Sequence, residues 1–125
     1  MKTEIFSEED EVNMSASDVT NSIKGIKGSA RVRIYTEHKE NLGELTGRFF
    51  TGFTIFQGTG YYKGVREEAA VIEIIIDTKD DKEPIYAADV MRVFGLANLI
   101  AMRNHQKEVI VTTEAVPYSY SVFGV

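Results

Sequence analysis

The run Ala69–Ile76, read AAVIEIII, limits the fold of this chain more than any other segment. It lies between the charged residues Glu68 and Asp77, and Glu73 is its one residue that is not apolar. The run is much shorter than the roughly 20 apolar residues that a membrane-spanning helix needs. Nearly continuous apolar runs of this length are typical of a central strand that is covered on both faces. The sequence therefore predicts a sheet with this strand in its interior.

Three further strands are predicted from alternation and composition. Residues 51–62 are aromatic and β-branched but contain three glycines, which indicates a strand with a bulge or a close backbone approach. Residues 108–114 form another strand, and 117–123 form a weak extra strand or an ordered tail. Residues 30–38 form a strand with one buried face, because Val32, Ile34 and Thr36 alternate with Arg33, Tyr35 and Glu37.

Two segments have helical spacing. The spacing of Leu42, Leu45 and Phe49 predicts a short helix over 40–50, although two glycines lower the helix propensity of this segment. After a polar loop over 77–83, Pro84 suits the first turn of a helix. The long helix that follows should turn Asp89, Arg92 and Arg103 toward water and bury one stripe, comprising Val90, Val93, Phe94, Ala97, Ile100 and Ala101.

The predicted order of elements is strand, short helix, strand, strand, long helix, strand. This βαββαβ order is that of the ferredoxin-like α+β fold, in which two helices cover one face of an antiparallel sheet. The other face then lacks a cover, although its strands are rich in aliphatic and aromatic residues. We therefore expect other copies of the chain to bury that face, in an oligomer.

Charge divides the 125 residues into two parts. The net charge is −5, and residues 1–23 carry the whole excess. We expect an acidic, polar N-terminal arm over 1–28 and one α+β domain over 29–125. A basic stripe with interleaved aromatic residues is missing, which argues against nucleic-acid binding. With no Cys, no membrane span and no signal peptide, the chain is expected in the cytoplasm.

The sequence indicates neither a metal centre nor a protein nucleophile. His38 and His105 form no HxxxH or HxH pair, so each is interpreted as a surface or helix-end residue. No GxSxG elbow surrounds a serine, and Gly58-Thr-Gly60 lacks the Lys-Ser/Thr of a phosphate-binding loop. We therefore expect no metal and no cofactor.

The segment 58–68 is the strongest candidate for a binding site. A hairpin there would bring Tyr61 or Tyr62 close to Glu67 or Glu68, and only one residue of each pair can face a given pocket. An aromatic ring with a carboxylate suits a cationic or adenine-bearing small molecule. The structural alternative is a solvated hairpin in which Lys63 and Arg66 neutralise the glutamates.

The segment Gly60–Glu68 has the sequence GYYKGVREE, and an apolar strand, a long helix and the segment HQKEVIV at 105–111 follow it. Together these features resemble the phage-encoded S-adenosylmethionine (SAM) lyases, once called SAM hydrolases. The resemblance covers residues 30–114. In that family a Tyr after a Gly-rich turn, a Glu near the next strand and a Gln before the last core strand line the SAM pocket. On this chain the resemblance implies that Tyr62 and Glu68 are catalytic, that Gly60, Tyr61, Glu67 and Gln106 bind the substrate, and that Glu73 is an alternative carboxylate.

The family also implies a mechanism and an assembly. The carboxylate of SAM attacks its own γ-carbon and releases 5′-methylthioadenosine and homoserine lactone, so no metal, cofactor or protein nucleophile is needed. In outline the chain is similar to PII-like and CutA-like trimers, which place ligand sites between subunits. The resemblance thus implies a homotrimeric phage protein that depletes SAM in the host cytoplasm and acts against restriction and other SAM-dependent defence.

A competing hypothesis is a PII-like module that binds or sequesters an adenine nucleotide without catalysis. Such a module should present several Lys or Arg side chains to the phosphates. The hairpin offers Lys63 and Arg66 beside two carboxylates, and this mixed set favours a zwitterion such as SAM.

Overall fold

The computed structural model describes residues 29–77, 87–116 and 124. Its elements follow the predicted order of strands and helices: β1 (Ser29–Glu37), α2 (Leu42–Gly47), β2 (Thr54–Tyr62), β3 (Val65–Ile76), α3 (Ala87–Arg103) and β4 (Ile110–Val116). The expected acidic arm over 1–28, the helix start at Pro84 and the weak strand over 117–123 lie outside the described residues.

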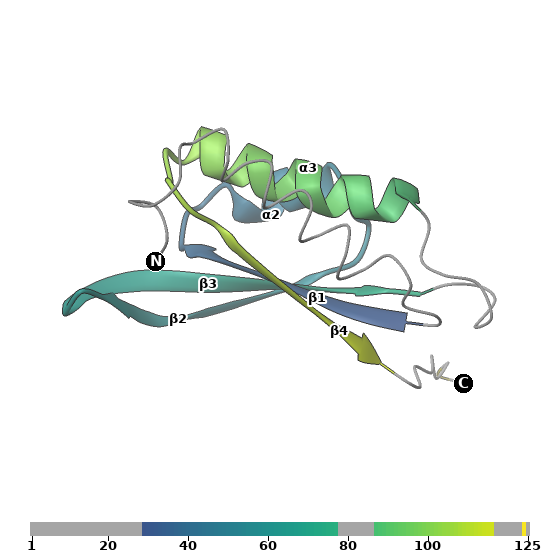
Figure 1. Cartoon of the computed structure of the whole chain (residues 1–125), viewed down its shortest axis with the longest axis horizontal. Coiled ribbons are helices and arrows are strands. Elements are labelled where there is room, and N and C mark those ends of the chain that lie inside the picture. The colour runs from purple at the N-terminus through teal and green to yellow at the C-terminus, as the bar shows by residue number, and fades with distance from the viewer. Residues whose placement is uncertain (1–28, 78–86, 117–123, 125) are drawn as a thin grey trace.

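The four strands form one sheet in the order β2-β3-β1-β4, and every neighbouring pair is antiparallel. Both helices lie on the same face of this sheet (Figure 1). The chain is therefore an α+β protein with a four-stranded antiparallel sheet and two helices, which is compatible with the predicted ferredoxin-like fold. As predicted, β3 lies in the interior of the sheet.

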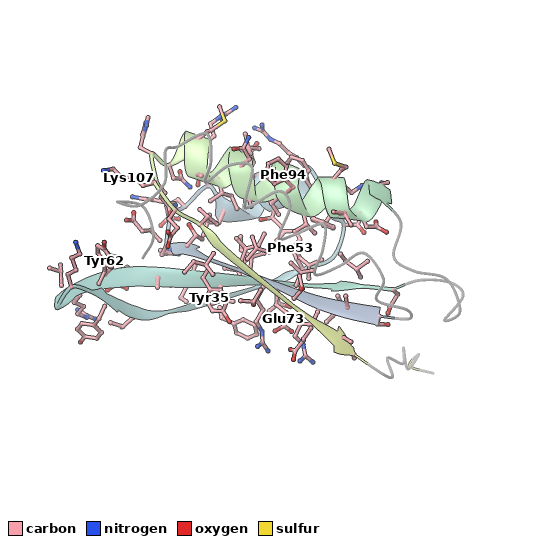
Figure 2. All side chains as sticks on the ribbon, viewed as in Figure 1. Tyr35, Phe53, Tyr62, Glu73, Phe94 and Lys107 are labelled. Atoms are coloured by element: carbon pink, nitrogen blue, oxygen red, sulfur yellow. The ribbon has the colours of Figure 1, made fainter. Side chains whose placement is uncertain are left out.

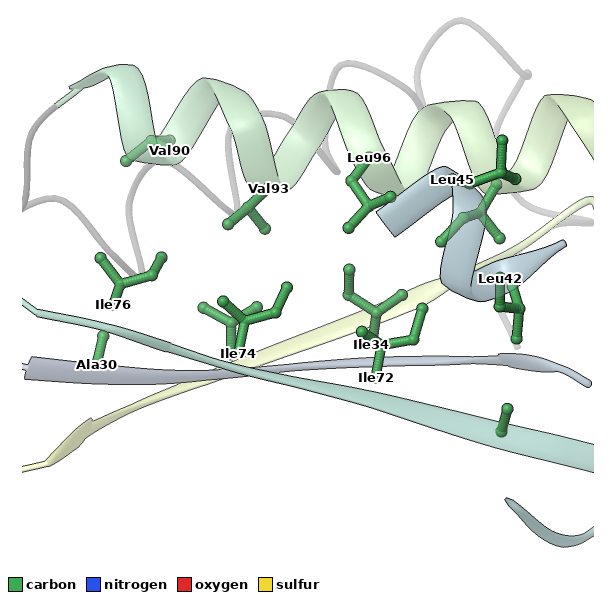
Figure 3. Packing of buried hydrophobic residues seen from close by; sticks show 13 residues of the cluster. Ala30, Ile34, Leu42, Leu45, Ile72, Ile74, Ile76, Val90, Val93 and Leu96 are labelled. Carbon is green, nitrogen blue, oxygen red and sulfur yellow. The ribbon is translucent and has the colours of Figure 1, made fainter. Parts of the chain in front are cut away.

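The hydrophobic core fills the space between the helices and the sheet face that they cover, which we call the helix face (Figure 3). Alternate residues of β1 and β3 point into it, including Ile34 and Ile74, as the period of a strand requires. Helix α3 contributes Val90, Val93, Leu96, Ala97 and Ile100.

The predicted stripe of α3 is confirmed at four of these positions, but it omits Leu96, and Phe94 and Ala101 are only partly buried. The helix thus presents positions 93, 96, 97 and 100 to the sheet, a stripe centred closer to Leu96 than expected.

Strand β2 begins three residues later than predicted, and two turns explain the changed starts of β3 and β4. Strand β3 begins three residues early because only Lys63 and Gly64 connect it to β2, with φ of 51° and 79°. Two successive positive φ values are the signature of a type I′ hairpin turn. Strand β4 begins two residues late because α3 ends in a Schellman motif, with His105 at φ 54° and the Gln106 amide donating to the Ala101 carbonyl at 2.9 Å.

The second sheet face, which we call the open face, is not covered by the described part of the chain. Tyr35 and Glu73 lie on the side of the sheet away from α3 (Figure 2). Large apolar side chains on this face are well exposed, among them Phe56 at 52%, Ile110 at 50% and Ile75 at 42%. The prediction that β3 is covered on both faces therefore holds for only one face within a single chain.

Neither α2 nor α3, the two helices of the described residues, is long and apolar enough to span a membrane.

Candidate functional site

The β2–β3 hairpin projects beyond the helices and carries most of the residues that the sequence singles out (Figure 1). Its register is continuous from Thr54 opposite Glu73 to Tyr62 opposite Val65, so no bulge interrupts it. The alternative expectation, a close backbone approach, fits Gly60, where a Cβ would lie 3.3 Å from the Cβ of Ala69. Gly60 therefore lets the two strands pack closely at the base of the projecting end.

Strand alternation divides the predicted site residues between two faces. Gly60, Tyr62 and Glu67 share one face of the hairpin, because successive residues alternate and the register places Gly60 opposite Glu67. Tyr61 and Glu68 share the other face of the hairpin. The hairpin thus brings Tyr62 near Glu67 and Tyr61 near Glu68, as diagonal cross-strand neighbours. Within one chain it separates the two predicted catalytic residues, Tyr62 and Glu68.

The hairpin end is open to solvent. The exposed fraction is 72% for Tyr61 and 36% for Tyr62. The ammonium of Lys63 lies 5.4 Å from the centroid of the Tyr62 ring, within the range of a cation–π contact. Nη2 of Arg66 lies 3.5 Å from Oε1 of Glu68, an exposed ion pair of small energy. Aromatic rings and charges of both signs are therefore available to a ligand here.

Gln106 lies at the C-terminal end of β1 rather than on the hairpin. Its Oε1 accepts hydrogen bonds from Oγ1 of Thr36 at 2.8 Å and from the backbone N–H of Glu37 at 3.2 Å. On the other side of β1, the N–H of His38 donates to the carbonyl oxygen of Glu68 at 2.9 Å. The end of β1 therefore links two predicted site residues, Glu68 and Gln106, in one chain.

Two polar atoms at this place have no hydrogen-bond partner among the described residues. They are Nδ1 of His38 and Nε2 of Gln106, and both are shielded from solvent. A few residues along the chain from each, the side chains of Asn41 and Asn104 exchange two hydrogen bonds of 2.8 and 3.1 Å and so tie the start of α2 to the end of α3. The end of β1 is therefore a small polar site held by three elements.

His38, interpreted from the sequence as a surface or helix-end residue, is partly exposed as a whole, although its Nδ1 is shielded from solvent.

The open face carries an ion-pair cluster made of Arg31, Arg33, Glu73 and Glu114. Nε of Arg33 lies 3.0 Å from Oε2 of Glu73, and Nη1 of Arg31 lies 2.6 Å from Oε1 of Glu114. The hydrogen bond to Glu73 is the main cause that raises the pKa of Arg33 above its usual value, so this guanidinium stays charged at every ordinary pH. The candidate carboxylates are those of Glu67, Glu68 and Glu73, and the one on Glu73 forms an ion pair in this cluster.

The part of the chain that the structure describes contains no group of three or more His, Cys, Asp or Glu side chains that could hold a metal ion. No protein-family model, no curated protein and no solved structure matches the chain at a significant level.

Proposed function

We propose that this chain is a SAM lyase that cleaves SAM into 5′-methylthioadenosine and homoserine lactone. The observation that carries the proposal is the pairing on the hairpin: each face presents one tyrosine beside one glutamate, Tyr62 with Glu67 and Tyr61 with Glu68. SAM carries a sulfonium, an ammonium, a carboxylate and an adenine ring. Rings and carboxylates bind the cationic parts and the adenine, and the exposed Lys63 and Arg66 suit the carboxylate.

The reaction needs the protein mainly to hold SAM in the reactive conformation. A carboxylate oxygen of SAM attacks the γ-carbon and forms the C–O bond of the lactone. The bond between the γ-carbon and sulfur breaks, and its electron pair neutralises the sulfonium, which leaves as the thioether of 5′-methylthioadenosine. No proton, water or co-reactant is consumed. Holding the chain of SAM folded in this near-attack geometry is the catalytic effect, which in well-oriented systems reaches about 7–11 kcal/mol.

The proposed roles follow the chemistry of each side chain. A Tyr62 ring and hydroxyl orient the methionine part of SAM, and Glu68 binds the ammonium or sulfonium. Tyr61, Gly60 and Glu67 complete the wall of the pocket, and Gln106 donates a hydrogen bond to a polar edge of the substrate. Because Tyr62 and Glu68 of one chain lie on opposite faces, the site is completed by a neighbouring copy.

A closed ring of copies, a PII-like homotrimer, supplies that neighbour. Strand β2 is an edge of the sheet without a charged residue, a proline or a bulge, and such edges invite pairing with another chain. Strand β4 is the other edge, and it runs opposite to β2, so β4 of the next copy can pair with β2 in antiparallel fashion. A ring covers both edges of every copy and turns the open face inward, where exposed residues such as Phe56 and Ile110 become buried.

The test is to incubate the purified full chain with SAM and follow both products by mass spectrometry. We expect 5′-methylthioadenosine and homoserine lactone in equal amounts. Tyr62→Phe and Glu68→Gln should lose turnover without changing the molar mass of the oligomer. Glu44→Gln is the matched control, because Glu44 is an exposed carboxylate on α2 that pairs with Arg48 and has no role in the proposed site, so it should leave the rate unchanged. Intact SAM, or full activity in both site variants, contradicts the proposal.

A second candidate function is non-catalytic binding of an adenine nucleotide at the same place. The cations Lys63 and Arg66 at the exposed hairpin end favour it, because phosphates need such partners. Uncleaved SAM together with a rise in melting temperature on adding ATP or ADP would support this alternative. If the lyase is active, the expected setting is a phage protein acting in the host cytoplasm, where loss of SAM blunts restriction and other SAM-dependent defence.

A further inference from the structure

The open face carries a continuous row of apolar side chains that the chemistry of SAM cleavage does not use. The register places Phe56 opposite Val71, and Val71 opposite Tyr35. It also places Tyr35 opposite Ile110, so the row crosses all four strands. Directly opposed residues of neighbouring strands share a face, and three of these four side chains are exposed in the single chain. An apolar row of this kind marks an interaction surface.

The ion-pair cluster on the same face is electrically neutral. Besides its two short pairs, Nε of Arg31 lies 4.0 Å from Oε1 of Glu73, and Nη1 of Arg33 lies 4.0 Å from Oε1 of Glu114. Each arginine therefore lies near both carboxylates. Between 23% and 51% of each of the four side chains is exposed, so their charges can still reach another molecule. The open face thus combines an apolar row with two positive and two negative charges.

This charge balance decides which kind of partner the open face fits. Nucleic acid, or a peptide with charges of one sign, is attracted by a surface of the opposite net charge, which the cluster does not provide. A second copy of the chain brings two charges of each sign, so its arginines can pair with glutamates of this copy without net repulsion. Such pairs fix the relative position of two partners and reject wrong ones. The apolar rows supply the area that becomes buried.

We propose that the open faces of the copies pack together, and that the ion-pair cluster selects like copies through Arg–Glu contacts between chains. The inference rests on the assembly in the proposed function, and it adds the charges by which one copy recognises another. It does not depend on the cleavage of SAM.

The first test reverses one charge and measures the oligomer of the full chain by sedimentation and native mass spectrometry. Glu114→Arg leaves three positive charges against one in the cluster, and it should raise the dissociation constant of the oligomer about tenfold or more. Glu44→Arg is the matched control, because Glu44 is an exposed, ion-paired carboxylate on α2, which covers the other face of the sheet (Figure 1). An equal effect of the two reversals, or an unmodified chain that stays monomeric, overturns the inference.

The second test separates contacts between chains from contacts within one chain. A chain with all four charges reversed, Arg31→Glu, Arg33→Glu, Glu73→Arg and Glu114→Arg, keeps every ion pair of the cluster with the signs exchanged. Alone it should form the same oligomer as the unmodified chain. When the two chains are unfolded and refolded together, mixed contacts place like charges together. We therefore expect mixed oligomers about tenfold or more below the binomial proportion.

Mixing in binomial proportion overturns the inference, because ion pairs that act only within one chain do not select between the two. The single reversals decide the question if the fully reversed chain does not fold. Both tests are made without SAM, so they separate this inference from the lyase. Selective assembly without cleavage of SAM upholds the inference and rejects the lyase, whereas cleavage by copies that mix freely does the reverse.

Discussion

The helix face and the open face are built from alternate residues of the same strands, yet their surroundings differ. Ile74 on the helix face is 1% exposed, whereas its neighbour Ile75 on the open face is 42% exposed. The helix face packs an apolar cluster against α2 and α3, and the open face mixes apolar side chains with the cluster of Arg31, Arg33, Glu73 and Glu114. An apolar strand sequence alone therefore does not show which face of the strand a single chain can cover.

The sharpest way to test this contrast is to truncate the two neighbouring isoleucines separately. Ile74→Ala should lower the free energy of unfolding by about 2–5 kcal/mol, because it leaves a cavity between the sheet and α3. Ile75→Ala removes a side chain that the isolated chain leaves half in water. If further copies cover this face, the variant should weaken their association, and its loss of stability should grow as the protein is diluted.

Urea denaturation at several protein concentrations distinguishes the two effects. If both variants lost the same free energy of unfolding at every protein concentration, this would contradict the view that the chain itself covers one face and further copies cover the other.

The hairpin turn offers a second contrast with the compact part of the fold. Gly64→Ala forces a Cβ into a backbone with φ of 79° and should cost about 1–2 kcal/mol. Gly43→Ala lies in α2 with nothing within 4 Å of the new Cβ, so it should stabilise the chain by about 0.5–1 kcal/mol. Chemical denaturation measures both. A stabilising Gly64→Ala would show that the turn does not have the type I′ conformation.

Two buried threonines give a further pair of small effects, of opposite sign. Oγ1 of Thr46 is buried with no partner in the described residues, whereas Oγ1 of Thr36 donates to Gln106. Thr46→Val should therefore raise the free energy of unfolding by roughly 1 kcal/mol, and Thr36→Val should lower it by a similar amount. Thermal melts of the two variants should shift in opposite directions, and a shared direction would contradict the assigned hydrogen bond.

The sequence predicts the strand and helix order well because the apolar periodicity is strong. The run at 69–76 and the alternation at 30–36 each identify a strand without reference to the rest of the chain. The boundaries are harder, because the turn at Lys63 and Gly64 and the helix end at His105 depend on backbone conformation rather than on hydropathy.

The candidate site is predicted in part. The sequence predicts that the tyrosines and glutamates of 58–68 lie on one hairpin, because this segment is rich in glycine and aromatic residues. It leaves open which side chains share a face, and that follows only from the register of β2 with β3. The contact of Gln106 with Thr36 is not predicted, because the two residues are 70 positions apart in the sequence.

We propose that Tyr62 and Glu68 act together although one chain holds them on opposite faces, so that two copies build each site. The direct measurement is SAM turnover in a mixture of Tyr62→Phe and Glu68→Gln chains that have been unfolded together and refolded. Random assembly gives about a quarter of the sites with both native residues, so we expect about a quarter of the activity of the unmodified chain from two inactive parents. A mixture that stays as inactive as its parents would contradict the account.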